Sequence, residues 1–145
     1  MKLTSSRLKH CRGVAEKMRK MVLSNPDKYH LVPEEMYILG MLHDIGYAFV
    51  RNHRDHAIAG AEILRDSEYK YWKEVLYHSS DQNEYDSVAL QLLNYADLTV
   101  GPNGEDMTIP ERIGDISARY GQGSIQVQNA LAVMEKLKQL GYKTF

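Results

Sequence analysis

The chain has 145 residues, 43% hydrophobic and 26% charged, with 18 Lys and Arg against 19 Asp and Glu. This composition predicts one globular domain over residues 1–145 and excludes disordered, collagen-like and disulfide-scaffold proteins. The balanced charge argues against nucleic acid as the main partner, because duplex binding needs a basic excess. A single cysteine, Cys11, and the lack of a leader or membrane-spanning segment predict a cytoplasmic protein.

The first part of the chain shows helical spacing of its apolar residues. A first helix is predicted to end near Asn25-Pro26. A second begins at Pro33, where proline needs no hydrogen-bond donor and the acids that follow favour the positive helix end, and it runs to about Tyr47. The stripe of the first helix consists of Leu8, Cys11, Ala15, Met18 and Val22.

Three more helices are predicted in the middle of the chain. The third is capped by Asn52 or Asp55 and ends near Arg65. The fourth ends at His78, and the fifth spans about 85–98, before a Gly-Pro-Asn-Gly turn.

Two further helices complete the predicted fold. Thr108 and Glu111 form a capping box at the start of one of them. The last follows Ser124 and stops at Gly141. No segment alternates at period two, so the fold class is all-α, a compact bundle of six or seven helices. The side chains predicted to face inward on the last helix are Val127, Leu131, Met134 and Leu137.

Polar residues interrupt segments that should be buried. Residues 37–50 are apolar on all sides of the predicted helix, yet they contain His43 and Asp44. An unpaired carboxylate in such a place is costly, and a cation is an economical partner for it.

The same anomaly recurs on the inward faces of other predicted helices. Each residue alone also fits a simpler interpretation, such as a hydrogen-bonded core histidine or a helix-terminal aspartate. Their conjunction favours a metal site near the centre of the bundle. The other inward polar residues are His10, His56, His78 and Asp97.

The ordered set of His10, His43-Asp44 and Asp97 resembles the HD-domain superfamily of metal-dependent phosphohydrolases. The resemblance includes the segment 41–46, Met-Leu-His-Asp-Ile-Gly, and extends over almost the whole chain. The chain is similar to the small single-domain bacterial members, which include symmetrical diadenosine tetraphosphate hydrolases. The resemblance implies an all-α bundle with a metal site at its centre.

The resemblance also implies a ligand set for one or two divalent transition metal ions. One ion would be held by His10, His43, Asp44 and Asp97, and a second by Asp44, His56 and His78. Imidazole and carboxylate ligands suit Fe, Mn, Zn, Co or Ni. Such ions lower the pKa of a bound water and stabilise charge on phosphate oxygens.

One departure from the family pattern concerns the cation that contacts phosphate. Many relatives carry Lys just after the His-Asp motif, where this chain has Tyr47. Arg54 is the leading replacement, and His53 is a substrate-facing candidate. With Asp44 they form the predicted catalytic set. Further arginines that could replace the lysine are Arg51, Arg112 and Arg119.

The sequence therefore favours a metal-dependent phosphohydrolase acting on a small phosphorylated substrate, a nucleotide or another phosphoester. The alternative is a catalytically weak HD domain that binds a nucleotide or metal as a regulatory module. A purely structural helical domain is the third interpretation. A homodimer through the last helix, 124–140, and packing of that helix within the chain both fit its apolar stripe.

Overall fold

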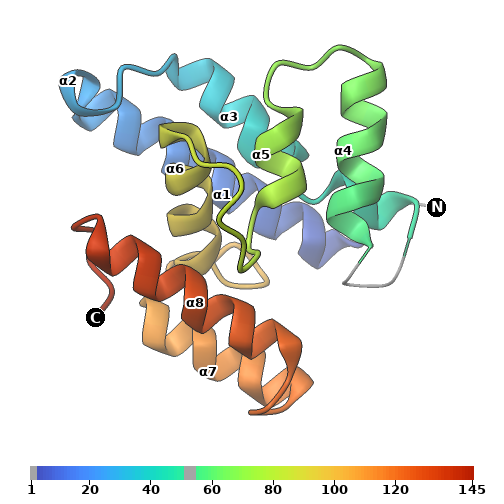
Figure 1. Cartoon of the computed structure of the whole chain (residues 1–145), viewed down its shortest axis with the longest axis vertical. Coiled ribbons are helices and arrows are strands. Elements are labelled where there is room, and N and C mark those ends of the chain that lie inside the picture. The colour runs from blue at the N-terminus through green and yellow to red at the C-terminus, as the bar shows by residue number, and fades with distance from the viewer. Residues whose placement is uncertain (1–2, 51–54) are drawn as a thin grey trace.

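The computed structural model describes residues 3–50 and 55–145, and these contain eight α-helices, one short 3₁₀ helix and no strand (Figure 1). The predicted all-α class is confirmed, although the described part has more helices than predicted. One of the extra elements is the four-residue α2, too short to show a periodic pattern. The helices are α1 (Ser5–Ser24), α2 (Pro26–Tyr29), α3 (Pro33–Leu42), η1 (Ile45–Ala48), α4 (His56–Asp66), α5 (Trp72–Tyr77), α6 (Val88–Leu98), α7 (Ile109–Tyr120) and α8 (Ile125–Gln139).

Helix α6 lies at the centre of the bundle and contacts α1, α3, α5, α7 and α8 (Figure 1). Its Leu92 and Leu93 are buried in the larger hydrophobic cluster, which also involves α1 and α3. Its Leu98 belongs to a smaller cluster with α7 and α8. Asp97 therefore lies where the two hydrophobic clusters meet.

The last three helices each begin at a side-chain cap. Thr108 and Glu111 form the predicted capping box, and the Ser124 hydroxyl accepts a hydrogen bond from the Val127 N–H. The fifth predicted helix begins at Val88 rather than near residue 85, because the Ser87 hydroxyl caps it by accepting from the Leu90 N–H.

The predicted inward face of the last helix is partly wrong. Leu131 is 44% exposed, whereas Ala130 and Val133 are buried with Val127 and Leu137. Helix α8 is therefore rotated from the predicted orientation, so that Ala130, Val133 and Leu137 face the smaller hydrophobic cluster.

Helices α1 and α3 approach each other closely at Gly40. A Cβ atom added there would lie 2.5 Å from the Cα of Ala15, closer than any ordinary contact. This close approach places His10 of α1 beside His43, with the ring centroids 5.4 Å apart. Gly40 is thus required for the two helices to bring these histidines together.

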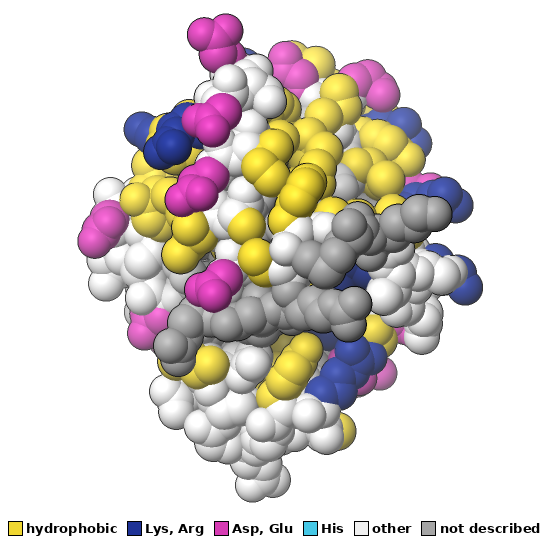
Figure 2. Space-filling view, turned by 90° about the vertical axis from the view of Figure 1, so that its right-hand side faces the viewer, with side chains coloured by type: hydrophobic (Ala, Val, Ile, Leu, Met, Phe, Trp, Pro, Cys, Tyr) yellow, Lys and Arg dark blue, Asp and Glu magenta, His cyan; other side chains and the backbone are white. Residues whose placement is uncertain are grey.

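The molecular surface carries charges of both signs. On the α4 side of the molecule, hydrophobic side chains gather in the upper half of the view, with acidic and basic side chains around them (Figure 2). Within residues 3–50 and 55–145, every helix is too short or too polar to cross a bilayer.

Candidate metal centre

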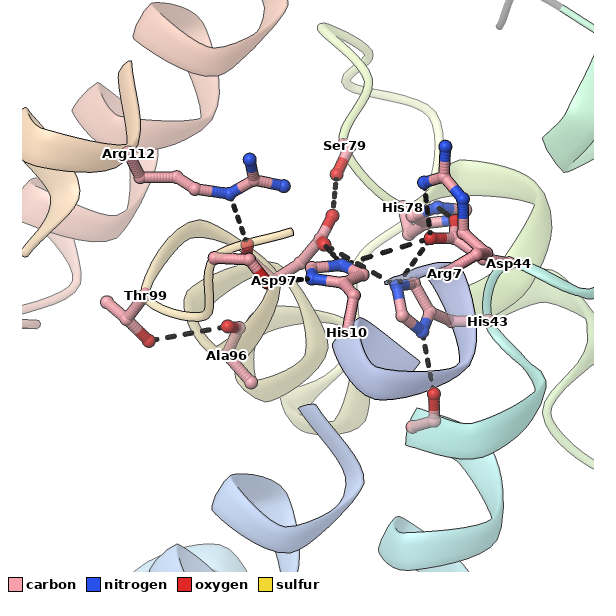
Figure 3. Close-up of polar contacts among 12 residues, drawn as sticks. Arg7, His10, His43, Asp44, His78, Ser79, Ala96, Asp97, Thr99 and Arg112 are labelled. Atoms are coloured by element: carbon pink, nitrogen blue, oxygen red, sulfur yellow. Dashed lines mark hydrogen bonds and ion pairs between the residues drawn. The ribbon is translucent and has the colours of Figure 1, made fainter. Parts of the chain in front are cut away.

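The six polar residues predicted to face inward are all buried in one cluster, and Figure 3 shows five of them, all except His56. Five separate parts of the chain contribute to it, so residues far apart in sequence meet at the centre of the bundle. Their relative exposures range from 0% for His43 to 9% for Asp97. The cluster consists of His10 of α1, His43 and Asp44 after α3, His56 of α4, His78 after α5, and Asp97 of α6.

The helix predicted to run from Pro33 to Tyr47 ends at Leu42 instead. His43 and Asp44 lie in the turn before η1, and the backbone of Asp44 leaves the helical conformation, with φ −106° and ψ 17°. On a continuous helix, adjacent side chains point about 100° apart. The turn allows both His43 and Asp44 to enter the same cluster.

Gly46 holds this turn against the start of α4. A Cβ atom at position 46 would lie 1.7 Å from the carbonyl oxygen of His56. Gly60 of α4 packs against the same backbone, since its own Cβ would lie 3.1 Å from the Gly46 nitrogen. The absence of side chains at both glycines therefore brings His56 up to Asp44.

Three histidines share one hydrogen-bonding arrangement. The Nδ1–H of His43 donates to the Gly40 carbonyl at 2.6 Å, and that of His78 donates to the Val75 carbonyl at 2.6 Å. His10 donates in the same way to Gly101, at 2.9 Å. Because a carbonyl oxygen can only accept, Nδ1 carries the proton and Nε2 is the nitrogen that faces the cluster.

The two carboxylate oxygens of Asp44 face different histidines. Oδ1 lies 3.2 Å from Nε2 of His56 and 3.4 Å from Nε2 of His78. Oδ2 lies 3.3 Å from Nε2 of His43 and 3.8 Å from Nε2 of His10. Asp44 thus joins two halves of the cluster, as a bridging carboxylate would.

Asp97 belongs to the half of the cluster that contains His10 and His43. Its Oδ1 lies 2.8 Å from Nε2 of His10 and 3.4 Å from Nε2 of His43. Its Oδ2 accepts a hydrogen bond from the Ser79 hydroxyl at 2.5 Å. Ser79 has a left-handed backbone, with φ 55°, and its N–H donates to the Asn94 side chain at 2.8 Å. Ser79 therefore fixes which oxygen of Asp97 faces the histidines.

The charges of these buried groups depend on one another. Burial opposes ionisation of both residues, but the attraction between them outweighs it, so the pKa of His43 is well above and that of Asp44 well below the usual value. Burial likewise opposes ionisation of Asp97, yet its hydrogen bond with His10 helps hold the pKa of Asp97 well below the usual range. The cluster therefore stabilises positive charge between its carboxylates.

The donor set fits divalent metal ions. Nε2 of His43 is fully buried and makes no hydrogen bond, although oxygens of Asp44 and Asp97 lie 3.3 and 3.4 Å away. A buried ring nitrogen without a hydrogen bond is costly unless another partner satisfies it. Three groups of donors each have their ligand atoms within 4.8 Å of one another. They are His10, His43 and Asp44; His43, His78 and Asp97; and Asp44, His56 and His78.

Arg7 supplies a cation that the sequence interpretation missed. Its Nη1 donates to Oδ2 of Asp44 at 3.2 Å, and its guanidinium lies 3.8 Å from the centre of the Tyr47 ring. The Tyr47 ring also stacks on the ring of His56, with centroids 4.1 Å apart. Tyr47, which replaces the expected lysine, thus packs between an arginine and a histidine of the cluster. Arg7 precedes His10 by three residues on one helix, a spacing that shares a face and offered a signal.

Of the arginines predicted as possible replacements for the lysine, the structure describes Arg112 and Arg119. Arg112 of α7 reaches toward Asp97, where its Nε donates to the Asp97 carbonyl at 3.3 Å (Figure 3). Arg112 and Arg119 line a cavity beside the cluster and both pair with Asp115. The candidate catalytic residues His53 and Arg54, with Arg51, lie outside the described residues.

The structure is a helical domain with a buried cluster of histidines and aspartates that could hold a metal ion. The family model described as HD domain matches residues 7–118, more than half of the chain. The chain belongs to this family, the HD superfamily of metal-dependent phosphohydrolases, which confirms the resemblance seen in the sequence. Comparison with curated proteins gave no match, and comparison with solved structures gave none either.

Proposed function

We propose that the protein is a metal-dependent phosphohydrolase that cleaves a small phosphorylated substrate, a nucleotide or another phosphoester. The observation that carries the proposal is the convergence of four histidine Nε2 atoms on the carboxylates of Asp44 and Asp97. Family membership supports the same chemistry.

In this proposal, the metal ligands are His10, His43, Asp44 and Asp97 for one ion and Asp44, His56 and His78 for a second. Fe, Mn, Zn, Co and Ni all suit this donor set. When bound, such ions make a nucleophilic water available near neutral pH and stabilise charge on the phosphate. Asp44 holds the two halves together, and Ser79 orients Asp97 through its hydrogen bond.

Arg7 is proposed to contact the substrate phosphate. Its side chain is 30% exposed, whereas Asp44 is buried, so the guanidinium lies between the cluster and solvent. Its position over Tyr47 provides the positive charge that the missing lysine supplies in relatives. His53 and Arg54 stay proposed as substrate-facing residues. The alternative is a regulatory module that binds a nucleotide or metal without turnover, and Tyr47 in place of the lysine favours it.

The function is tested by metal analysis and turnover together. Protein purified without chelator or histidine tag is expected to contain two equivalents of transition metal and to hydrolyse p-nitrophenyl phosphate. His56→Ala is expected to contain about one equivalent, because Nε2 of His56 lies 3.2 Å from Oδ1 of Asp44, the oxygen that faces the second proposed ion site. His30→Ala, at an exposed histidine away from the cluster, is the matched control and should retain both equivalents.

Other results of this experiment would contradict the proposal in distinct ways. Metal-free protein whose melting temperature does not change on addition of metal would exclude a metal centre. Full metal content with tight nucleotide binding and no product from any phosphoester would favour the regulatory module.

The role of Arg7 gives a separate prediction. Arg7→Gln is expected to lower kcat/KM for p-nitrophenyl phosphate by about a hundredfold, since one electrostatic contact to the reacting group is lost. Metal content should stay unchanged, because arginine is not a ligand. Arg12→Gln, an exposed arginine on the same helix, should retain full activity. Equal activity of the two variants would remove Arg7 from the substrate site.

A further inference from the structure

A cavity of about 100 Å³ lies directly beside the proposed metal centre. Arg7 and His10 of α1 and Asp97 of α6 line one side of it, and α7 and α8 line the other. The α7–α8 pair lies against the end of α6 in Figure 1, and Figure 3 shows Arg112 extending from α7 toward Asp97. A substrate whose phosphate contacts the cluster therefore has an adjoining space for the rest of the molecule.

The size of the cavity limits what it can hold. At about 100 Å³, the space suits a compact group such as a single ring.

The wall formed by α8 is uncharged. Gln126 and Asn129 offer amide donors and acceptors, while Ala130 and Val133 are apolar and buried. An uncharged group with hydrogen-bonding atoms along one edge complements such a wall.

The two arginines of α7 that line the cavity already form ion pairs with an aspartate of the same helix. Arg112 Nη1 lies 3.1 Å from Oδ2 of Asp115, and Arg119 Nε lies 3.4 Å from Oδ1 of the same residue. Asp115 thus offsets part of the positive charge on this side. A second strongly anionic group in the substrate has no dedicated partner on α8.

The position of α8 in the chain adds an independent observation. The match to the HD domain ends at residue 118, and α8 begins at Ile125. The metal-ligand candidates lie inside the matched range, whereas the α8 wall lies beyond it. The α8 wall of the cavity is thus a feature of this chain that the match to the HD domain does not cover.

We infer that this cavity binds an uncharged polar ring of the alcohol that leaves the substrate, either the sugar of a sugar phosphate or the nucleobase carried by a nucleoside. The inference rests on the proposed function, and Gln126 and Asn129 are its specificity-determining residues. Hydrolysis adds water across a phosphorus–oxygen bond and yields inorganic phosphate and the free alcohol. That alcohol is the product that the cavity accommodates.

Binding to metal-free protein tests the inference without turnover. Isothermal titration calorimetry with uridine and with D-ribose is expected to show binding of at least one of them to the unsubstituted chain. Gln126→Leu and Asn129→Leu are expected to weaken that binding at least tenfold. Gln128→Leu, an exposed position on the same helix, is the matched control and should bind as the unsubstituted chain does. Binding of ribose alone would assign a sugar ring, and binding of uridine alone would assign the base.

A second experiment measures the phosphatase kinetics of the metal-loaded protein. For uridine 5′-monophosphate or ribose 5-phosphate, Asn129→Leu is expected to raise KM at least tenfold with little change in kcat. Methyl phosphate has no ring, so its hydrolysis should not change. The inference would be overturned if neither alcohol bound the protein. It would also be overturned if Asn129→Leu raised the KM for methyl phosphate as much as that for the substrates with a ring. A chain that binds the alcohols through Asn129 but hydrolyses no phosphoester would contradict the leaving-group role and the proposed function together.

Discussion

Asp44→Asn is expected to remove transition metal from both halves of the cluster and to lower phosphoester turnover about a thousandfold. The reason is geometric, because one oxygen of Asp44 faces His56 and His78 and the other faces His10 and His43. Asparagine keeps the shape but loses the charge that both halves share. Metal content by elemental mass spectrometry and p-nitrophenyl phosphate turnover are the measurements.

The matched control for this variant is Asp66→Asn, at an exposed aspartate at the end of α4. It should keep the full metal content and turnover. If Asp44→Asn retained two equivalents of metal, Asp44 would not be the shared ligand, and the cluster would have to be reassigned. A far-ultraviolet circular dichroism spectrum like that of the unsubstituted chain shows that the loss of metal does not come from unfolding.

Gly46→Ala is expected to destabilise the protein by about 3 kcal/mol, because the backbone must move to accept a side chain. The added Cβ would lie 1.7 Å from the His56 carbonyl oxygen, which belongs to rigid backbone. For a chain of this length, that corresponds to a melting temperature lower by roughly 10 °C. Thermal unfolding followed by circular dichroism measures it.

Gly114→Ala is the control for the glycine variant. Gly114 lies within α7, and a Cβ atom there would have nothing within 4 Å. Alanine favours a helix by about 0.8–1 kcal/mol over glycine, so this variant should be more stable than the unsubstituted chain. If Gly46→Ala also melted at or above the unsubstituted chain, the close contact between η1 and α4 would be wrong.

Much of the fold follows from local signals in the sequence. Apolar spacing and capping residues predicted most helix positions, because an amphipathic helix and its cap are encoded within one short segment. The end of α3 was predicted wrongly at Tyr47, because the apolar segment continues past the turn. The turn after Leu42 packs Gly46 against the His56 carbonyl of α4, a contact between segments that the apolar pattern does not encode.

The candidate site likewise contains some residues that the sequence identifies and others that it does not. Buried polar residues such as Asp44 stand out in an apolar segment, so their position inside the fold could be predicted from the sequence. Arg7 had only a weak signal, its three-residue spacing from His10, since an arginine on a helix is usually solvated and the contacts of Arg7 with Tyr47 and Asp44 come from another segment. The cavity wall on α8 depends on how that helix is rotated, and the exposed Leu131 shows that the apolar stripe does not define this rotation.

The left-handed backbone of Ser79 has a consequence for the loop between α5 and α6. Glycine would adopt this conformation without steric cost, whereas serine there costs about 1 kcal/mol. Glycine, however, has no hydroxyl to hold Asp97. The conformation of this loop therefore sets the orientation of a central carboxylate, because the Ser79 hydroxyl links the loop to Asp97.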